Sequence, residues 1–139
     1  MAPGLHSCAD VSSVDGCPVV LLVDDDPDLR SAIGDALEDL GVEVIHARDG
    51  AEAIAMLRAG LRPHLALVDV MMPRMTGEQF AKAIRRWRWT LPIASMSAGE
   101  GVLSPPLVEC HLRKPFPLDA LERVVQRYCP ECRPPDPRA

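Results

Sequence analysis

The stretch VLLVDDDPDLR, residues 20–30, decides the fold because an apolar run ends there in a cluster of acids. The apolar run VVLLV at 19–23 has the continuous character of a strand that is buried on both faces. Three aspartates follow it directly at 24–26, and Asp28 comes two positions later. Like charges this close raise each other's pKa unless a positive group lies among them. The stretch therefore predicts a buried strand that ends at a site in need of a cation.

Length and composition limit the class of protein. The chain has 139 residues, 47% of them apolar, and a net charge of −5 without a basic tail. These values are typical of one globular domain and give no reason to expect nucleic-acid binding. No apolar run approaches the roughly 20 residues of a membrane helix, and the first 17 residues lack the Lys, Arg and apolar core of a signal peptide. We expect a cytoplasmic protein that binds neither nucleic acid nor membrane.

The two ends differ in composition from the middle. Residues 1–17 show no periodicity, and residues 130–139 hold four prolines, which prevent a helix. We therefore expect flexible tails at 1–17 and 130–139 on either side of one folded domain at 18–129. Cys129 and Cys132 form a lone CxxC pair without further ligands at zinc-site spacing. We interpret them as incidental thiols.

Between the tails, short apolar runs alternate with amphipathic stretches. The pattern indicates strands at 19–23, 42–47, 64–70, 92–96 and 110–113, and helices at 26–41 with their caps, 51–59, 76 or 77 to 86, and 118–128. Such alternation predicts an α/β fold with a doubly wound, five-stranded parallel sheet. The stretch RRWRW at 85–89 is interpreted as a helix end in which Trp87 faces inward and the arginines are solvated.

The segment between the fourth and fifth strands is unusual for a parallel crossover, which normally contains a helix. Glycines weaken helix formation at its start, and two prolines forbid a helix through its middle; these residues are Gly99, Gly101, Pro105 and Pro106. We therefore expect the fourth helix to be missing or reduced to about one turn at Ser104–Glu109.

Polar residues follow the strands of this predicted sheet. Asp24 and Asp25 follow the first strand, and Asp69, Ser97 and Lys114 lie at the ends of the third, fourth and fifth. Because carboxyl ends of parallel strands share one rim of the sheet, these side chains should converge. Three carboxylates and a nearby backbone carbonyl suit Mg²⁺. The lysine charge and the serine hydroxyl suit phosphoryl oxygens.

Four motifs in the right order resemble the response regulator receiver domain of two-component and phosphorelay signalling. They are LLVDDDPDLR, LVDVMMPRMTG, LPIASMSA and KPF, and the resemblance covers roughly residues 18–128. It implies a flavodoxin-like (βα)5 fold and a protein that signals instead of acting as a conventional enzyme. It also implies that Asp69 accepts a phosphoryl group, as an aspartyl phosphate, from a histidine kinase or a histidine phosphotransferase.

The same resemblance implies roles for further residues. Asp24 and Asp25 would bind Mg²⁺ together with Asp69 and the main-chain carbonyl of Met71. Asp26 falls at a variable position and is interpreted as a helix cap. Phosphate would be bound by Ser97 and Lys114, and the peptide bond to Pro115 would be cis.

Two features depart from the family pattern. His111 stands three residues before the lysine, where receiver domains usually carry an aromatic switch residue, and it can titrate near neutral pH. Only 16 residues separate Ser97 from Lys114, fewer than usual. Without a regular fourth helix, the usual dimerisation face would be altered. We therefore expect a monomer or weak dimer, with output through an unknown protein partner or onward phosphotransfer.

Three alternatives were open at this point. A haloacid-dehalogenase-like phosphatase would use Asp24 and Asp26 as its DxD pair, but its other motifs do not match. A flavodoxin-like FMN carrier would need a Ser/Thr/Gly-rich phosphate loop where this chain is acidic. A receiver-like binding module without phosphorylation is disfavoured because the Asp, Ser and Lys set is complete.

Overall fold

The structure is a computed structural model that describes residues 17–87, 90–99, 102–103, 105 and 107–129. Apart from Cys17, the expected tails lie outside the described residues, as do Trp89 and Cys132.

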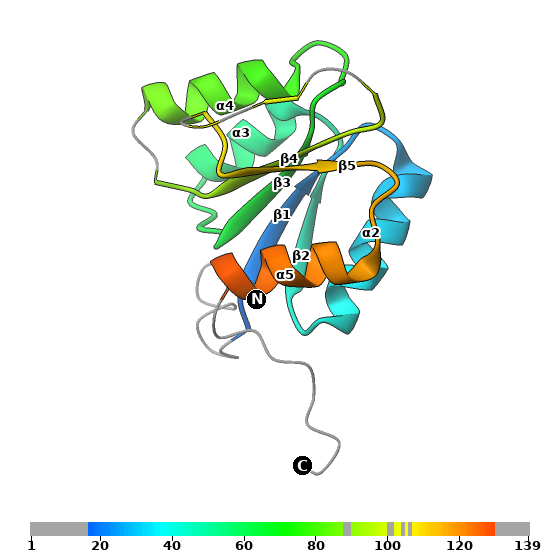
Figure 1. Cartoon of the computed structure of the whole chain (residues 1–139). Coiled ribbons are helices and arrows are strands. Elements are labelled where there is room, and N and C mark those ends of the chain that lie inside the picture. Colours follow the sequence, from blue (N-terminus) through cyan, green and yellow to red (C-terminus); the bar gives the residue numbers. More distant parts are fainter. Residues whose placement is uncertain (1–16, 88–89, 100–101, 104, 106, 130–139) are drawn as a thin grey trace.

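A five-stranded parallel sheet forms the centre, with the strand order β2-β1-β3-β4-β5 (Figure 1). The strands are β1 (Val19–Val23), β2 (Glu43–Ala47), β3 (Leu65–Asp69), β4 (Ile93–Ser97) and β5 (Cys110–Arg113). The helices are α2 (Pro27–Asp39), α3 (Gly50–Arg58), α4 (Gly77–Arg86) and α5 (Leu118–Tyr128). The fold class expected from the sequence is confirmed, with strand and helix ends shifted by at most two residues where they differ.

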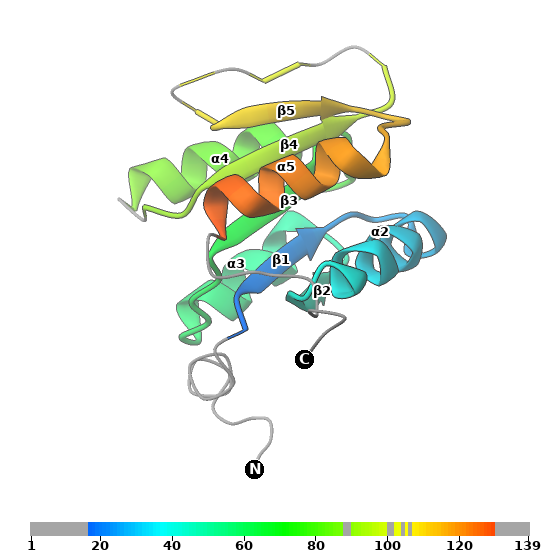
Figure 2. The ribbon, with the colours of Figure 1, turned by 60° about the horizontal axis from the view of Figure 1, so that its bottom comes forward.

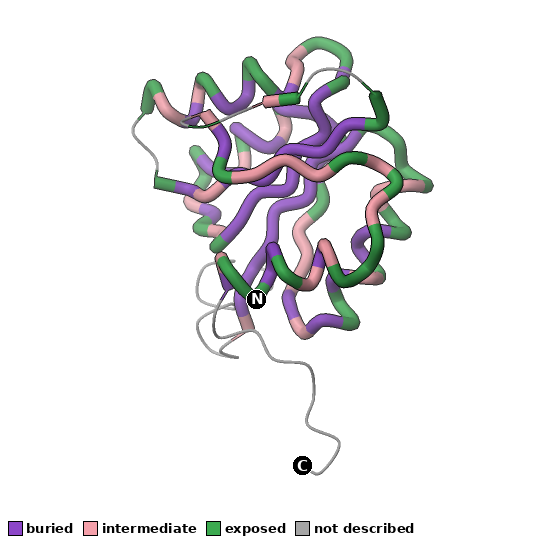
Figure 3. The backbone as a smooth tube through the Cα atoms, in the orientation of Figure 1, coloured by how far each residue is buried: buried purple, intermediate pink, exposed green. Residues whose placement is uncertain are grey.

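Helices cover both faces of the sheet, with α3 and α4 on one side and α2 and α5 on the other, as Figures 1 and 2 show. Buried residues of β1, β3 and β4 alternate between the two faces, because successive side chains of a strand point in opposite directions. One face packs on α3 and α4 around Phe80 and Ile84, and the other packs on α2 and α5 around Leu37 and Leu121. In Figure 3 the central strands are buried along their length. This explains why the β1 run is apolar without alternation.

Local signals place the start of the first described helix. The Asp26 side chain accepts hydrogen bonds from the backbone N–H groups of Asp28 and Leu29, and Pro27 takes the first helical position. After the helix, Gly41 has φ +93°, a conformation that glycine adopts without a Cβ penalty. Helix α2 therefore begins immediately after the acidic cluster and keeps that cluster at the end of β1.

The connection from β4 to β5 contains no helix in its described residues, as expected from its glycines and prolines. Its apolar side chains still pack on the α3–α4 face, with Val108 buried. Arg85 of α4 anchors it by donating to the carbonyl of Leu107 at 3.1 Å and to the Glu109 carboxylate at 2.9 Å. The same Glu109 oxygen accepts the backbone N–H of Ile93 at 2.7 Å. Polar contacts thus hold the connection where a helix would normally pack.

The interpretation of Trp87 was wrong. Its side chain is 38% exposed, and the guanidinium of Arg58 lies over its ring at 4.8 Å from the ring centre. Phe80 and Ile84 already fill the inward face of α4, so the next turn extends beyond the core. A stacked arginine on a surface tryptophan explains this aromatic residue without nucleic acid.

Among the described helices, none has the length and apolar character that crossing a membrane requires.

Candidate functional site

Three aspartates converge at the carboxyl ends of β1 and β3. One carboxylate oxygen from each of Asp24, Asp25 and Asp69 lies within 4.8 Å of the others. Asp24 and Asp69 are buried, whereas Asp25 is exposed. The pairing of β1 with β3 places both strand ends on the same rim of the sheet. The acids that the sequence places after two separate strands are therefore neighbours in space.

Lys114 brings a positive charge to this cluster from the end of β5. Its Nζ donates to Asp24 Oδ2 at 3.1 Å and to Asp69 Oδ1 at 3.4 Å. The lysine side chain is only 13% exposed. The other oxygen of Asp24 accepts the backbone N–H of Asp26. Within the described residues, one lysine therefore contacts two of the three carboxylates.

The environment makes Asp69 a poor acid. Burial raises its pKa above the ordinary value of 3.8, and the charge of Asp24 raises it further. Lys114 acts in the opposite direction through its charge and its hydrogen bond, as does the backbone of Met71. The net shift of the Asp69 pKa is upward. The charge of Lys114 does not fully offset the effect of burial on the Asp69 pKa, so the site favours additional positive charge.

The donor set fits a hard divalent cation. Carboxylate oxygens are the ligands that Mg²⁺ takes from proteins, and it keeps several waters besides. Residues Asp24, Asp25 and Asp69 could supply such oxygens. Met71 follows β3 by two residues and is 67% exposed, and its main-chain carbonyl is the further ligand that the family resemblance implies. A bound cation would lower the pKa of Asp69, which burial and then the charge of Asp24 raise.

The loop after β3 is held tightly against the end of that strand. The N–H of Gly77 donates to the carbonyl of Val70, and a Cβ at position 77 would lie 2.6 Å from the carbonyl oxygen of Asp69. Thr76 and Gln79 form a reciprocal capping box at the start of α4. Arg74 has φ +68°, which is uncommon for a residue other than glycine. The loop therefore fixes the backbone of Asp69 through a glycine contact.

Ser97 and His111 lie on the same rim, where they form a hydrogen bond with each other. Ser97 is fully buried, and its Oγ lies 2.9 Å from His111 Nε2 and 3.2 Å from the Gly99 carbonyl. The Ser97 carbonyl accepts the N–H of Lys114 at 2.7 Å. The Lys114–Pro115 peptide bond is cis. The rim thus holds every residue that the sequence placed there, although Ser97 does not contact the acids directly.

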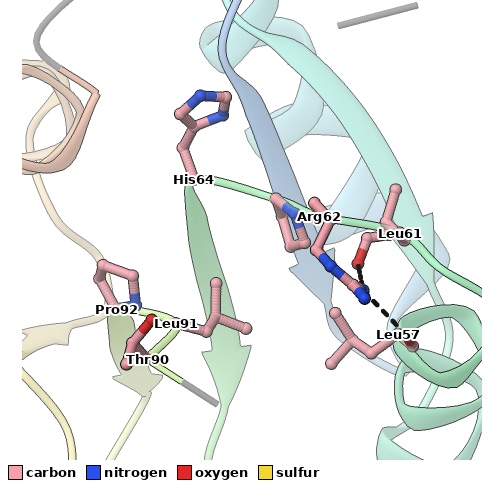
Figure 4. A pocket seen from close by; sticks show the side chains of 8 residues that line it. Leu57, Leu61, Arg62, His64, Thr90, Leu91 and Pro92 are labelled. Atoms are coloured by element: carbon pink, nitrogen blue, oxygen red, sulfur yellow. Dashed lines mark hydrogen bonds between the residues drawn. The ribbon is translucent and has the colours of Figure 1, made fainter. Parts of the chain in front are cut away.

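A separate pocket of about 410 Å³ lies at the opposite end of the sheet, where β3 and β4 begin (Figure 4). Its lining includes Leu57, Leu61 and Leu91, and Arg62 donates to the carbonyls of Leu57 and Leu61. It contains no cluster of acids or nucleophiles among the described residues that line it. The chemistry therefore belongs to the acidic rim and not to this pocket.

Sequence reasoning missed three residues that shape the site. Arg30 donates to the carbonyl of Asp24 at 2.7 Å, Gly77 contacts the backbone of Asp69, and Ser95 contacts His111. A glycine directly after a helix cap signals a close contact, and a serine two positions before Ser97 lies on the same face of its strand. Arg30 gave no such signal, because only the folded backbone turns it toward Asp24.

Comparison with known families gives a match over most of the chain. The profile described as the response regulator receiver domain matches residues 20–126. The chain is 32% identical over 127 residues to the response regulator MprA of Mycobacterium sp. strain KMS, covering 85% of this chain and 55% of MprA. It is also 32% identical to the sensor histidine kinase RcsC of Salmonella typhi over 83% of this chain and 13% of the kinase. The chain thus spans about half of the one relative and a small part of the other.

Solved structures agree with the sequence match. The chemotaxis protein CheY4 of Vibrio cholerae has a TM-score of 0.71 and 33% identity, over 81% of this chain and 98% of that one. The response regulator TrrA of Thermotoga maritima, solved in complex with Mg²⁺ and BeF, has a TM-score of 0.73 and 26% identity. That match covers 80% of this chain and 98% of TrrA. These similarities favour a receiver domain over a phosphatase or a flavin carrier.

Proposed function

Because this chain belongs to the response regulator receiver domain family, we propose that Asp69 accepts a phosphoryl group from a histidine kinase or a histidine phosphotransferase, with Mg²⁺ bound. A receiver domain is a signalling module and not a conventional enzyme. Partnership with histidine kinases is general to the family. The identity of Asp69 as the acceptor is the proposal made here, and it is supported by the position of Asp69 within the acidic cluster.

The proposed step transfers one phosphoryl group between two side chains. A carboxylate oxygen of Asp69 attacks the phosphorus atom, the phosphorus–nitrogen bond to the donor histidine breaks, and the leaving ring nitrogen keeps the electron pair and takes up a proton. Lys114 Nζ lies 3.4 Å from Asp69 Oδ1, so its charge can stabilise the transferring oxygens. Bound Mg²⁺ would neutralise further negative charge on the same group. Most of the work is positioning, because little covalent chemistry is left to the protein.

One observation carries this proposal. Three carboxylates of β1 and β3 lie within 4.8 Å of one another, and Lys114 contacts the two that are buried. Buried like charges are costly unless a cation holds them together. A site of this kind is suited to receive a group that carries several negative oxygens together with a metal ion.

For the output, we propose protein–protein contact or onward phosphotransfer in the cytoplasm by a receiver domain that is a monomer or weak dimer. Support comes from the β4–β5 connection, which lacks a helix in its described residues and so gives the β5 side an unusual surface. Sedimentation before and after phosphorylation tests this part. A tight phosphorylation-dependent dimer through the β5–α5 face would contradict it.

Intact mass spectrometry tests the transfer itself. The protein is incubated with Mg²⁺ and acetyl phosphate, and we expect a mass gain of one phosphoryl group that EDTA prevents. Asp69→Asn should abolish the gain, whereas Asp39→Asn, a change on the exposed face of α2, should keep it. A phosphoryl group that persists on Asp69→Asn would overturn the assignment.

A further inference from the structure

Two serines of β4 enclose the ring of His111 between them. Ser95 Oγ lies 2.6 Å from Nδ1, and Ser97 Oγ lies 2.9 Å from Nε2. Both ring nitrogens therefore have a hydroxyl partner, and the ring joins two side chains that do not share a direct bond. Ser97 lies on the rim beside the acidic site. The tautomer of the His111 ring therefore bears on whether the Ser97 hydroxyl can donate to a ligand there.

The sheet itself creates this arrangement. Ser95 pairs with His111 in the parallel register of β4 and β5, and Ser97 lies two positions further along the same face. Both serines are fully buried, so their hydroxyl groups need partners inside the protein. His111 is half-buried and supplies a partner to each.

The hydrogen atoms available to Ser95, His111 and Ser97 determine which of them donates in each hydrogen bond. Ser97 Oγ donates its only hydrogen to the Gly99 carbonyl at 3.2 Å, so it must accept from His111 Nε2–H. A neutral ring with its proton on Nε2 leaves Nδ1 as an acceptor, and Ser95 Oγ then donates to it across the shortest contact of the set. Burial, and secondarily Arg113, lower the pKa of His111, which keeps the ring neutral near neutral pH.

The other tautomer, with the proton on Nδ1, gives these side chains poorer hydrogen bonds. With the proton on Nδ1, His111 would donate to Ser95, which would pass its hydrogen to the Cys110 carbonyl at 3.4 Å. Ser97 would give its hydrogen to Nε2 and leave the Gly99 carbonyl contact unused. Contacts near 3.4 Å are weak hydrogen bonds. The observed distances therefore favour the proton on Nε2.

We infer that Ser95 fixes the His111 tautomer and that His111 acts as a positioning residue, which leaves the Ser97 hydroxyl hydrogen available to a phosphoryl oxygen at Asp69. This inference rests on the proposed function of the site. In this arrangement, the Ser97 hydrogen turns from the Gly99 carbonyl to the incoming oxygen while its lone pair stays occupied by Nε2–H. In the other tautomer, Ser97 would offer only lone pairs to a negatively charged group.

Nitrogen-15 NMR of histidine-labelled protein tests the hydrogen-bond chain without any phosphate. At about pH 7.5 we expect the Nε2–H tautomer for His111, assigned by its loss in His111→Leu. His64 is an internal reference, because its Nδ1 accepts the N–H of Val19 and its proton must be on Nε2. Ser95→Ala should move His111 toward a mixture of tautomers and leave His64 unchanged. An Nδ1–H tautomer in the wild-type protein would overturn the inference.

Affinity for beryllofluoride, measured with excess Mg²⁺, tests the link to phosphoryl binding. Loss of one neutral hydrogen bond predicts about three- to tenfold weaker binding for Ser95→Ala and for His111→Leu. Because Ser95 acts through His111, the double variant should bind no more weakly than His111→Leu alone. Ser31→Ala and His46→Leu are matched controls at exposed positions and should bind like the wild type.

The outcomes separate the two proposals. If Ser95→Ala binds beryllofluoride as tightly as the wild type does, the role of Ser95 and His111 is overturned, and the function of Asp69 stays intact. Additive losses in the double variant would also count against it. A wild-type protein that binds no beryllofluoride would overturn the proposed function and the role of His111 toward a phosphoryl group, while the NMR result would still decide the direction of the hydrogen-bond chain.

Discussion

Lys114 Nζ lies 3.1 Å from Asp24 Oδ2, although 90 positions separate the two residues in the chain. The contact spans the rim of the sheet from the end of β5 to the end of β1, passing Asp69 at the end of β3. Asp24 is fully buried, and the ion pair with Lys114 offsets part of the cost of burying its carboxylate. The lysine therefore stabilises the fold and also lies beside Asp69, where we propose that phosphoryl transfer takes place.

We expect Lys114→Met to destabilise the protein by about 3–5 kcal/mol in EDTA, because it leaves buried carboxylates without their partner. Excess Mg²⁺ should restore part of the loss. Denaturant unfolding measures both effects. As a control, Lys82→Met removes an exposed ion pair with Glu78 and should cost less than about 1 kcal/mol. Equal stability losses in the two variants would show that the Lys114 contact has no special weight.

Asp69→Asn should make the metal-free protein more stable at neutral pH. Burial raises the pKa of Asp69, so the folded state binds the proton more tightly than the unfolded state does. Between the ordinary value of 3.8 and the raised value, stability of the wild type therefore falls as pH rises. The advantage of Asp69→Asn should shrink as pH falls through that range. Unfolding at a series of pH values in EDTA, with Asp39→Asn as control, measures the difference.

The elements and their order could be predicted from the sequence, since the strands other than β5 contain apolar runs and each helix has a periodic face. The rim could also be predicted, because Asp24, Asp69 and Lys114 each end a strand and parallel strands end together. The side-chain contacts within the fold could be predicted less well from the sequence. The Arg85–Glu109 contact depends on how a segment without a helix lies on α4. Trp87 was misplaced because periodicity does not show where a core ends.

Gly77→Ala should destabilise the protein by about 1–3 kcal/mol, as overpacking at fixed backbone atoms does. The new Cβ would lie 2.6 Å from the Asp69 carbonyl oxygen and 2.9 Å from the Val70 Cα, neither of which can move aside freely. Beryllofluoride affinity should fall as well, because Asp69 shifts with its backbone. Gly99→Ala is the control for the loss of stability, since its Cβ would meet nothing within 4 Å. A Gly77→Ala protein with wild-type melting and affinity would disprove the role of this contact.

Glu109→Ala should loosen the connection between β4 and β5. It removes the acceptor of the Ile93 N–H and the partner of Arg85, and an unsatisfied buried donor costs about 1–3 kcal/mol. Hydrogen exchange at the Ile93 amide should accelerate more than exchange in β1. Glu38→Ala, on the exposed side of α2, should change neither. Uniformly faster exchange across the sheet would mean that the contact stabilises the whole fold and not this connection.

The central claim is that Asp69, and no other acid of the cluster, carries the phosphoryl group. Borohydride reduces an aspartyl phosphate to homoserine, so the modified position can be read from peptide masses after phosphorylation with acetyl phosphate and Mg²⁺. Our account predicts homoserine at position 69 alone, with none in a sample treated with EDTA. Homoserine at Asp24, Asp25 or Asp26, or at no position despite a phosphorylated intact mass, would contradict it.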